Sequence, residues 1–191
     1  TTIEAANLKL QSIRPWAVAG GQRRVISRSD RASTRIVQIV ARGAALLLVI
    51  RDDNLDAEPL VITAPSTTES SDSFQLLPTG LRPLKTRRVS GGLAITVDNV
   101  DPTSPIIVTE NRVATNQLAR FTSATGRRSV SIQRALAEAS VQLAESTTGG
   151  SKSARRTARQ FYDRGRQLLK SGDSTNAYHA FQNARRELYR R

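Results

Sequence analysis

The stretch that decides the fold runs from Thr34 to Arg51 and reads TRIVQIVA-RG-AALLLVIR. Two runs of β-branched and aliphatic residues, Thr34–Ala41 and Ala44–Arg51, flank the pair Arg42-Gly43. Such runs favour strands, and a short Gly-containing interruption between them is typical of a β-hairpin. We therefore predict an antiparallel hairpin over these residues.

Further short apolar runs lie on both sides of this hairpin, separated by clusters of Pro, Gly, Asn and Ser. They are Ile3–Leu10, a stretch near Trp16–Ile26, Leu60–Thr63, Phe74–Leu77, Leu84–Val89, Leu93–Val97 and Ile106–Thr109. Apolar and polar residues alternate in Leu93–Val97, as in a strand with one buried face. Many short strands at this spacing predict a sandwich of two antiparallel sheets.

The pattern changes to a helical one at Asn111. Larger apolar residues and alanines then recur at steps of three or four, which predicts a long helix over Val113–Glu145, either continuous or broken near Gly126. The predicted fold class is therefore α+β, with a β-sandwich domain at residues 1–110 followed by a basic helical domain at residues 111–191.

Two more helices are expected at the end of the chain. Ser153 is placed to cap a helix that ends at Lys170. The residues Ser171-Gly172-Asp173 should then turn the chain into a last helix that ends near Arg190. Together with the long helix before them, these predict a three-helix bundle.

The last two predicted helices carry small and aromatic residues in a spacing that resembles one tetratricopeptide repeat. The matching positions are Gly165, the turn Gly172-Asp173, Ala177, Phe181 and Ala184. Small residues let two antiparallel helices approach closely, and Phe181 would fill the gap between them. The pattern departs from the repeat at Arg164 and Arg185, where Leu is usual, at Ser174, where an aromatic is common, and at Tyr189, where Pro is frequent. A single repeat of this kind needs a neighbour to cover it, and the preceding long helix would supply that cover.

The whole layout also resembles the C-terminal region of large secreted bacterial proteins with a glycoside-hydrolase-like catalytic part. In those proteins a β-sandwich and a helical tail follow the catalytic barrel. The segments that carry this resemblance are Ala45–Ile50, Leu60–Ala64, Gly80–Leu84, Arg88–Leu93 and Ile106–Thr109. The resemblance implies a secreted or envelope-associated accessory module, and it lends no catalytic residue to these 191 residues.

Composition excludes several kinds of site. The chain has no cysteine and one histidine, so a thiolate zinc site, a disulfide or a pair of imidazole ligands is impossible. Nowhere do enough apolar residues run together for a membrane span. The chain begins at Thr1 and has no methionine, which we interpret as an excised or processed piece of a longer protein.

Positive charge is concentrated in the helical part. Residues 1–110 carry 13 Lys and Arg against 11 Asp and Glu, whereas residues 111–191 carry 16 against 5. Such asymmetry points to an acidic partner, and Arg suits two-pronged recognition of anions. Candidate anion-binding residues are Arg155, Arg156, Arg159, Arg166, Arg185 and Arg186, although a solvated helix surface is the favoured interpretation. Phosphates of a nucleic acid are one such partner.

Other candidate sites are less specific. Asp52, Asn54, Asp56 and Glu58 have an oxygen-rich spacing, but Ala57 stands where a calcium loop needs Gly, so a solvated loop is favoured. We predict no bound cofactor or metal.

Two aromatic or titratable side chains allow both a structural and a functional interpretation. Trp16 is expected to anchor the core rather than to stack on a sugar. His179 has no Cys or Gly-x-Ser-x-Gly nucleophile to serve.

A basic run, Arg82, Lys85, Arg87 and Arg88, fits a solvated strand edge.

The sequence thus favours a non-catalytic accessory or interaction module. Binding of a polyanion or nucleic acid by the helical domain is the first alternative. A carbohydrate-binding sandwich is the second. Ligand identity and oligomeric state stay open.

Overall fold

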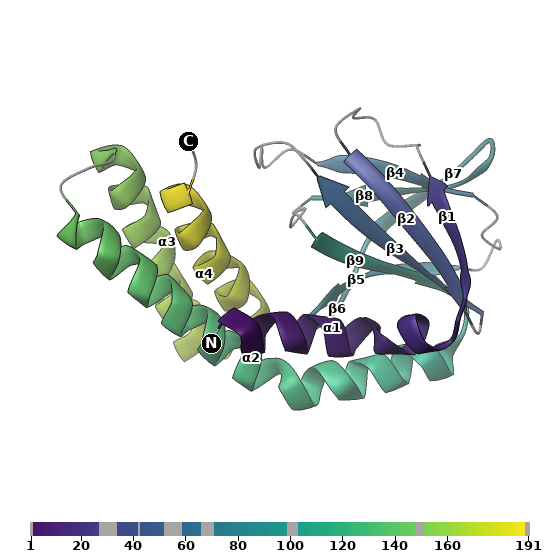
Figure 1. Ribbon diagram of the computed structural model, residues 1–191, viewed down its shortest axis with the longest axis horizontal. Coiled ribbons are helices and arrows are strands. Elements are labelled where there is room, and N and C mark those ends of the chain that lie inside the picture. Colours follow the sequence, from purple (N-terminus) through teal and green to yellow (C-terminus); the bar gives the residue numbers. More distant parts are fainter. Residues whose placement is uncertain are drawn as a thin grey trace. The chain divides into compact units, whose positions relative to one another are not determined.

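The computed structural model describes residues 2–26, 34–41, 43–51, 59–65, 71–98, 103–147 and 151–189. Its fold class is α+β, as predicted, with two antiparallel sheets and four helices (Figure 1). The helices are α1 (Thr2–Val18), α2 (Arg112–Ser146), α3 (Lys152–Lys170) and α4 (Ser174–Tyr189). The strands are β1 (Gln22–Ile26), β2 (Thr34–Ala41), β3 (Ala44–Arg51), β4 (Leu60–Ala64), β5 (Asp72–Leu77), β6 (Gly80–Pro83), β7 (Lys85–Val89), β8 (Gly92–Val97) and β9 (Thr103–Thr109).

The chain divides into two compact units, and each is described by itself. The first comprises residues 1–10, 78–80 and 122–191, and the second comprises residues 11–77 and 81–121. Separate domains at 1–110 and 111–191 therefore stay a prediction.

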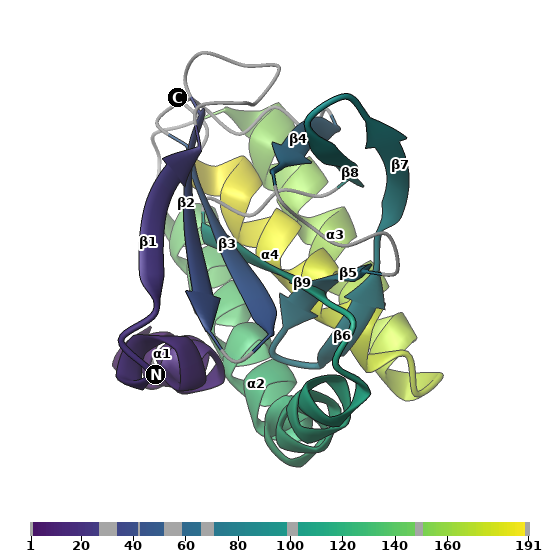
Figure 2. The ribbon, with the colours of Figure 1, turned by 90° about the vertical axis from the view of Figure 1, so that its right-hand side faces the viewer.

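The second unit contains a six-stranded sheet of order β1-β2-β3-β9-β5-β6 and a three-stranded sheet of order β4-β8-β7, which Figure 2 shows as separate groups of strands. The predicted hairpin is confirmed, since β2 and β3 pair antiparallel from Thr34↔Arg51 to Ala41↔Ala44. Gly43 has φ +74°, a left-handed conformation that a β-branched residue would adopt only with strain.

Both faces of β3 are buried, which explains its unbroken apolar sequence. On one face Ala45, Leu47 and Val49 join a cluster with side chains of β4, β8 and β9. On the other face Ala44 and Leu46 belong to a second cluster, which also contains Trp16 of α1 and Leu118 of α2. A strand buried on both faces reads as a continuous apolar run rather than an alternating one.

The N-terminal strand prediction is wrong. Ile3–Leu10 and the start of the Trp16–Ile26 stretch lie in α1, and only Gln22–Ile26 forms a strand. Glu4, Ala5 and Leu8 are good helix formers, so local propensity favours the helix that is observed. Strand β6 was not predicted at all.

The long helix α2 is continuous through Gly126. A Cβ at this position would lie 3.5 Å from Thr79 Cα, so Gly126 packs beside the 78–80 turn of the same unit. The helix tolerates a glycine there because tertiary packing outweighs its propensity cost of about 1 kcal/mol.

In the first unit, α2, α3 and α4 share one buried cluster. It comprises Val130, Ala137 and Val141 of α2, Ala158 and Tyr162 of α3, and Ala177, Tyr178, Phe181 and Ala184 of α4. The ends of α3 and α4 lie close to those predicted, except that Ser151 rather than Ser153 caps α3. Its hydroxyl accepts the Ala154 amide at 3.4 Å, because the helix begins at Lys152.

Candidate functional site

Helix α3 has one apolar face and one basic face. Ala158, Tyr162 and Gly165 are buried and recur at the helical steps of four and three. The adjoining side of the helix, about 100° around its axis, carries cations with a single carboxylate, Asp163, among them. The basic face of α3 consists of Lys152, Arg155, Arg156, Arg159, Arg166 and Lys170.

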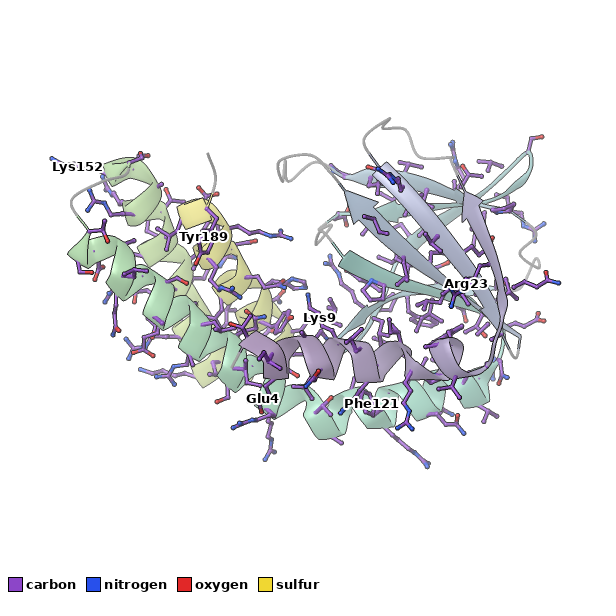
Figure 3. The ribbon with its side chains drawn as sticks, in the orientation of Figure 1. Glu4, Lys9, Arg23, Phe121, Lys152 and Tyr189 are labelled. Carbon is purple, nitrogen blue, oxygen red and sulfur yellow. The ribbon has the colours of Figure 1, made fainter. Side chains whose placement is uncertain are left out.

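The spacing of these residues places them along a narrow strip. At 3.6 residues per turn they fall within about 100° of the helix circumference, and from first to last they span roughly 27 Å of helix axis. All are exposed except Arg155, which is half-buried. Lys152 is labelled at the start of α3 in Figure 3. The arrangement can hold several anionic groups in a row.

Two arginines of this face also have structural contacts. Arg155 Nη1 donates to the carbonyl oxygens of Ala144 at 3.3 Å and Thr147 at 3.2 Å, and so satisfies carbonyls at the C-terminal end of α2. Arg159 lies 3.4 Å from Glu145 Oε1 and 3.3 Å from Asp163 Oδ2. Its charge is therefore partly balanced within the protein.

The other cations of this face have no such balance. Within the described part of the chain, no ion pair joins Arg156, Arg166, Lys152 or Lys170 to a carboxylate. Within this face, the two arginines and two lysines are therefore the cations whose charge is not balanced by a carboxylate of the described residues.

The two candidate arginines of α4 do not form one group with each other. Arg185 is half-buried and its Nη1 donates to Gln133 Oε1 of α2 at 3.3 Å. Its Nε is buried with no hydrogen-bond partner among the described residues. Arg186 follows it directly, and successive helix residues point about 100° apart. The six arginines predicted to bind anions thus form two sets. Four lie on α3, and the two on α4 point in different directions from each other.

Sequence reasoning missed Lys152 and Lys170 as members of the basic face. Both have the helical spacing that relates them to Arg156 and Arg166, so periodicity alone contained the signal. It also missed the pairing of Glu4 with Arg128, whose Nε lies 2.7 Å from the carboxylate. The hydrogen bond from Arg128 lowers the pKa of Glu4 (labelled in Figure 3) and raises that of Arg128.

The connection between α3 and α4 is held by Asp173. Its Oδ1 accepts the Asn176 backbone amide at 3.1 Å, and its Oδ2 accepts the Asn176 side-chain amide at 2.7 Å. These hydrogen bonds, the side-chain one foremost, lower the pKa of Asp173. Asp173 therefore caps the N-terminus of α4, within the turn predicted at Ser171-Gly172-Asp173.

Trp16 is a core residue, as predicted. Its side chain is 4% exposed, and Nε1 donates to the Ala44 carbonyl oxygen at 3.2 Å. Trp16 consequently offers no exposed ring on which a sugar could stack.

Two candidates remain, His179 and an oxygen-rich stretch near residue 55. The His179 ring lies edge-on to Tyr178, with centroids 6.0 Å apart. Among the residues that the structure describes, no three His, Asp or Glu side chains gather as a metal site. The oxygen-rich stretch Asp52, Asn54, Asp56 and Glu58 lies outside the described residues.

The basic run near residue 85 lies where a solvated edge was expected. Arg87 and Arg88 are exposed on β7, which is an edge strand of the three-stranded sheet. Arg82 Nη2 lies 3.9 Å from Asp98 Oδ2. Charged side chains on an edge discourage pairing with another chain.

Comparisons with protein-family models, curated proteins and solved structures give no match to this chain. Among the described residues, no helix combines the length and apolar character needed to cross a membrane.

Proposed function

We propose that this chain is a non-catalytic interaction module that binds a polyanion through the basic face of α3. In finer detail, the strands would form a β-sandwich, and α2, α3 and α4 a three-helix bundle with a tetratricopeptide-like hairpin. The observation that carries the binding proposal is the strip of cations, all exposed except Arg155, that runs along α3 beside its packed face.

Geometry and electrostatics favour an extended anion over a small one. The cations are spread along roughly 27 Å of helix, so no single anion touches them all. A chain of phosphates or sulfates would meet them one after another and release its counterions. Guanidinium groups such as Arg156 and Arg166 can contact two oxygens of one phosphate.

The experiment compares two variants that lose the same charge. The test variant carries Arg156→Gln, Arg166→Gln and Lys170→Gln on the basic face of α3. The control carries Arg127→Gln, Arg134→Gln and Arg164→Gln, three exposed arginines that lie outside this face.

Binding to heparin and to a duplex DNA of arbitrary sequence would be measured over a range of salt concentrations. The unchanged chain should bind at low salt and weaken steeply as salt rises. Each phosphate contact contributes about 0.9 to the magnitude of the slope of log K against log salt. The test variant lacks three such contacts, so the magnitude of its slope should be smaller by about 2 to 3. Equal losses in the two variants would show that net charge alone attracts the anion, and no binding at low salt would reject the proposal.

A second proposal is that the chain is an accessory module of a larger secreted or envelope-associated, glycoside-hydrolase-like protein. Exposed apolar side chains on α1 favour it, because Ile3 is 78% and Leu10 61% exposed. Such side chains can pack against a protein partner. The test is the coding sequence upstream of Thr1. An in-frame barrel domain supports this origin, and a start codon immediately before Thr1 contradicts it.

A further inference from the structure

The second unit contains an apolar cavity of about 200 Å³ beside Trp16. Its walls come from α1, from the ends of β2 and β3, and from the first turns of α2. The lining residues are Gln11, Ser12, Pro15, Trp16, Ala41, Ala44, Ala114, Gln117, Leu118 and Phe121, the last of which is labelled in Figure 3. We call this space the Trp16 cavity.

Size and lining restrict what the Trp16 cavity can hold. A dry apolar cavity of about 150 Å³ is enough to bind benzene, whereas drug-sized ligands need about 300 Å³ or more. Two of the lining residues, Trp16 and Phe121, are aromatic, and aromatic groups prefer edge-to-face or offset contacts with one another. A ligand with a single six-membered ring therefore fits best.

One feature of α1 supplies a polar partner next to these walls. Pro15 has no amide hydrogen, so the carbonyl oxygen of Gln11 lacks the donor that a helix normally provides four residues later. Both residues line the Trp16 cavity. Because Gln11 is exposed, its carbonyl oxygen can accept a hydrogen bond either from water or from a ligand that brings a donor.

We propose that the Trp16 cavity binds a small phenol-like ligand, a single aromatic ring with one hydroxyl group. The ring packs between Trp16 and Phe121, and the hydroxyl donates to the carbonyl oxygen of Gln11. The hydrogen bond from Trp16 Nε1 to Ala44 keeps the indole ring fixed as one wall. This site is independent of the basic face of α3, because it lies in the other unit.

The test is a titration of the full chain with phenol and with toluene, followed by the emission of Trp16, the only tryptophan. Saturation-transfer NMR on each ligand gives a second measure of binding. Phenol should change the emission saturably and bind more tightly than toluene. In Pro15→Ala, which restores the missing helical donor, the preference for phenol should disappear.

A pair of alanine substitutions on α2 locates the site. Ala114→Leu places a larger side chain in the Trp16 cavity and should weaken phenol binding at least tenfold. Ala124→Leu makes the same change at an exposed position outside the cavity and should leave binding unchanged. Circular dichroism would verify that both variants fold.

Three outcomes would overturn the proposal. The first is the absence of saturable phenol binding in both measurements, and the second is equal weakening by the two leucine substitutions. The third is equal affinity for phenol and toluene in the unchanged chain, which would contradict the proposed hydrogen bond to Gln11.

Discussion

Replacing Gly165 by alanine tests the close approach of α3 and α4. A Cβ atom at this position would lie 2.6 Å from Cε1 and 2.8 Å from Cδ1 of Phe181. Ordinary contacts begin near 3.4 Å, so the ring or a helix must move by roughly 0.8 Å. Phe181 has 0% exposure, and its ring centroid lies 5.7 Å from that of Tyr162, so the ring is confined.

The expected effect is the difference of two terms. Overpacking a core costs about 1–3 kcal/mol, and alanine is favoured over glycine inside a helix by about 1 kcal/mol. The Gly165→Ala variant should therefore lose about 1 kcal/mol of unfolding free energy. For a chain of 191 residues this lowers the melting temperature by about 2–4 °C.

Gly126→Ala is the matched control. Gly126 also lies inside a helix, but the nearest atom to its added Cβ is Thr79 Cα at 3.5 Å, an ordinary contact distance. This variant receives the helix-propensity gain without the clash, so it should be stabilised by about 0.5–1 kcal/mol. The two substitutions should thus change stability in opposite directions.

Thermal and urea unfolding, followed by far-UV circular dichroism, would measure both variants. A double variant with Phe181→Leu adds a second check, because a smaller side chain at 181 should remove the penalty of Gly165→Ala. If Gly165→Ala stabilises the chain as much as Gly126→Ala does, the close approach of the two helices is wrong.

Three further predictions concern hydrogen bonds of single side chains. Asp173→Ala should cost about 1 kcal/mol of unfolding free energy as a lost cap. Because the folded-state pKa of Asp173 is lowered, its stabilisation is present at neutral pH and fades as pH falls through that pKa, whereas Asp173→Asn should remove this acid dependence, as urea unfolding at several pH values would show. Trp16→Phe keeps an aromatic side chain and removes only the hydrogen bond to Ala44, so it should cost about 0.5–1.5 kcal/mol of unfolding free energy. Trp16→Ala also removes the aromatic side chain from the core and should cost about 3–5 kcal/mol, as denaturant unfolding would show. Arg155→Ala should lower the melting temperature more than Arg156→Ala, and Arg156→Ala should weaken heparin binding without changing that temperature.

The strand-rich part of the fold was largely predictable, because its signals are local. Runs such as Thr34–Ala41 and Ala44–Arg51 combine β-branched residues with a turn, and both form strands at the predicted bounds. The two C-terminal helices were equally predictable from the sequence, since Gly172-Asp173 marks a turn between two amphipathic segments. In both regions propensity and tertiary structure agree.

The N-terminal helix was missed because Ile3–Leu10 and the stretch near Trp16–Ile26 were grouped with the short apolar runs that predict strands. The correct signal was nevertheless present. Ala5, Leu8, Ser12 and Trp16 recur at steps of three and four, and each is buried or half-buried in α1. Periodicity measured over the whole segment would have predicted a helix in place of a strand.

Counting charges could not reveal which arginines are available to a ligand. Arg155 and Arg156 are adjacent in the sequence and identical in chemistry, yet only Arg155 reaches the carbonyl oxygens at the end of α2. Arg185 likewise contacts Gln133, which is 52 residues away along the chain. Such assignments depend on which helix faces a given side chain, and local sequence does not contain that information. The basic face of α3 is therefore a stronger basis for the binding proposal than the total charge, because it specifies which substitutions must matter and which must not.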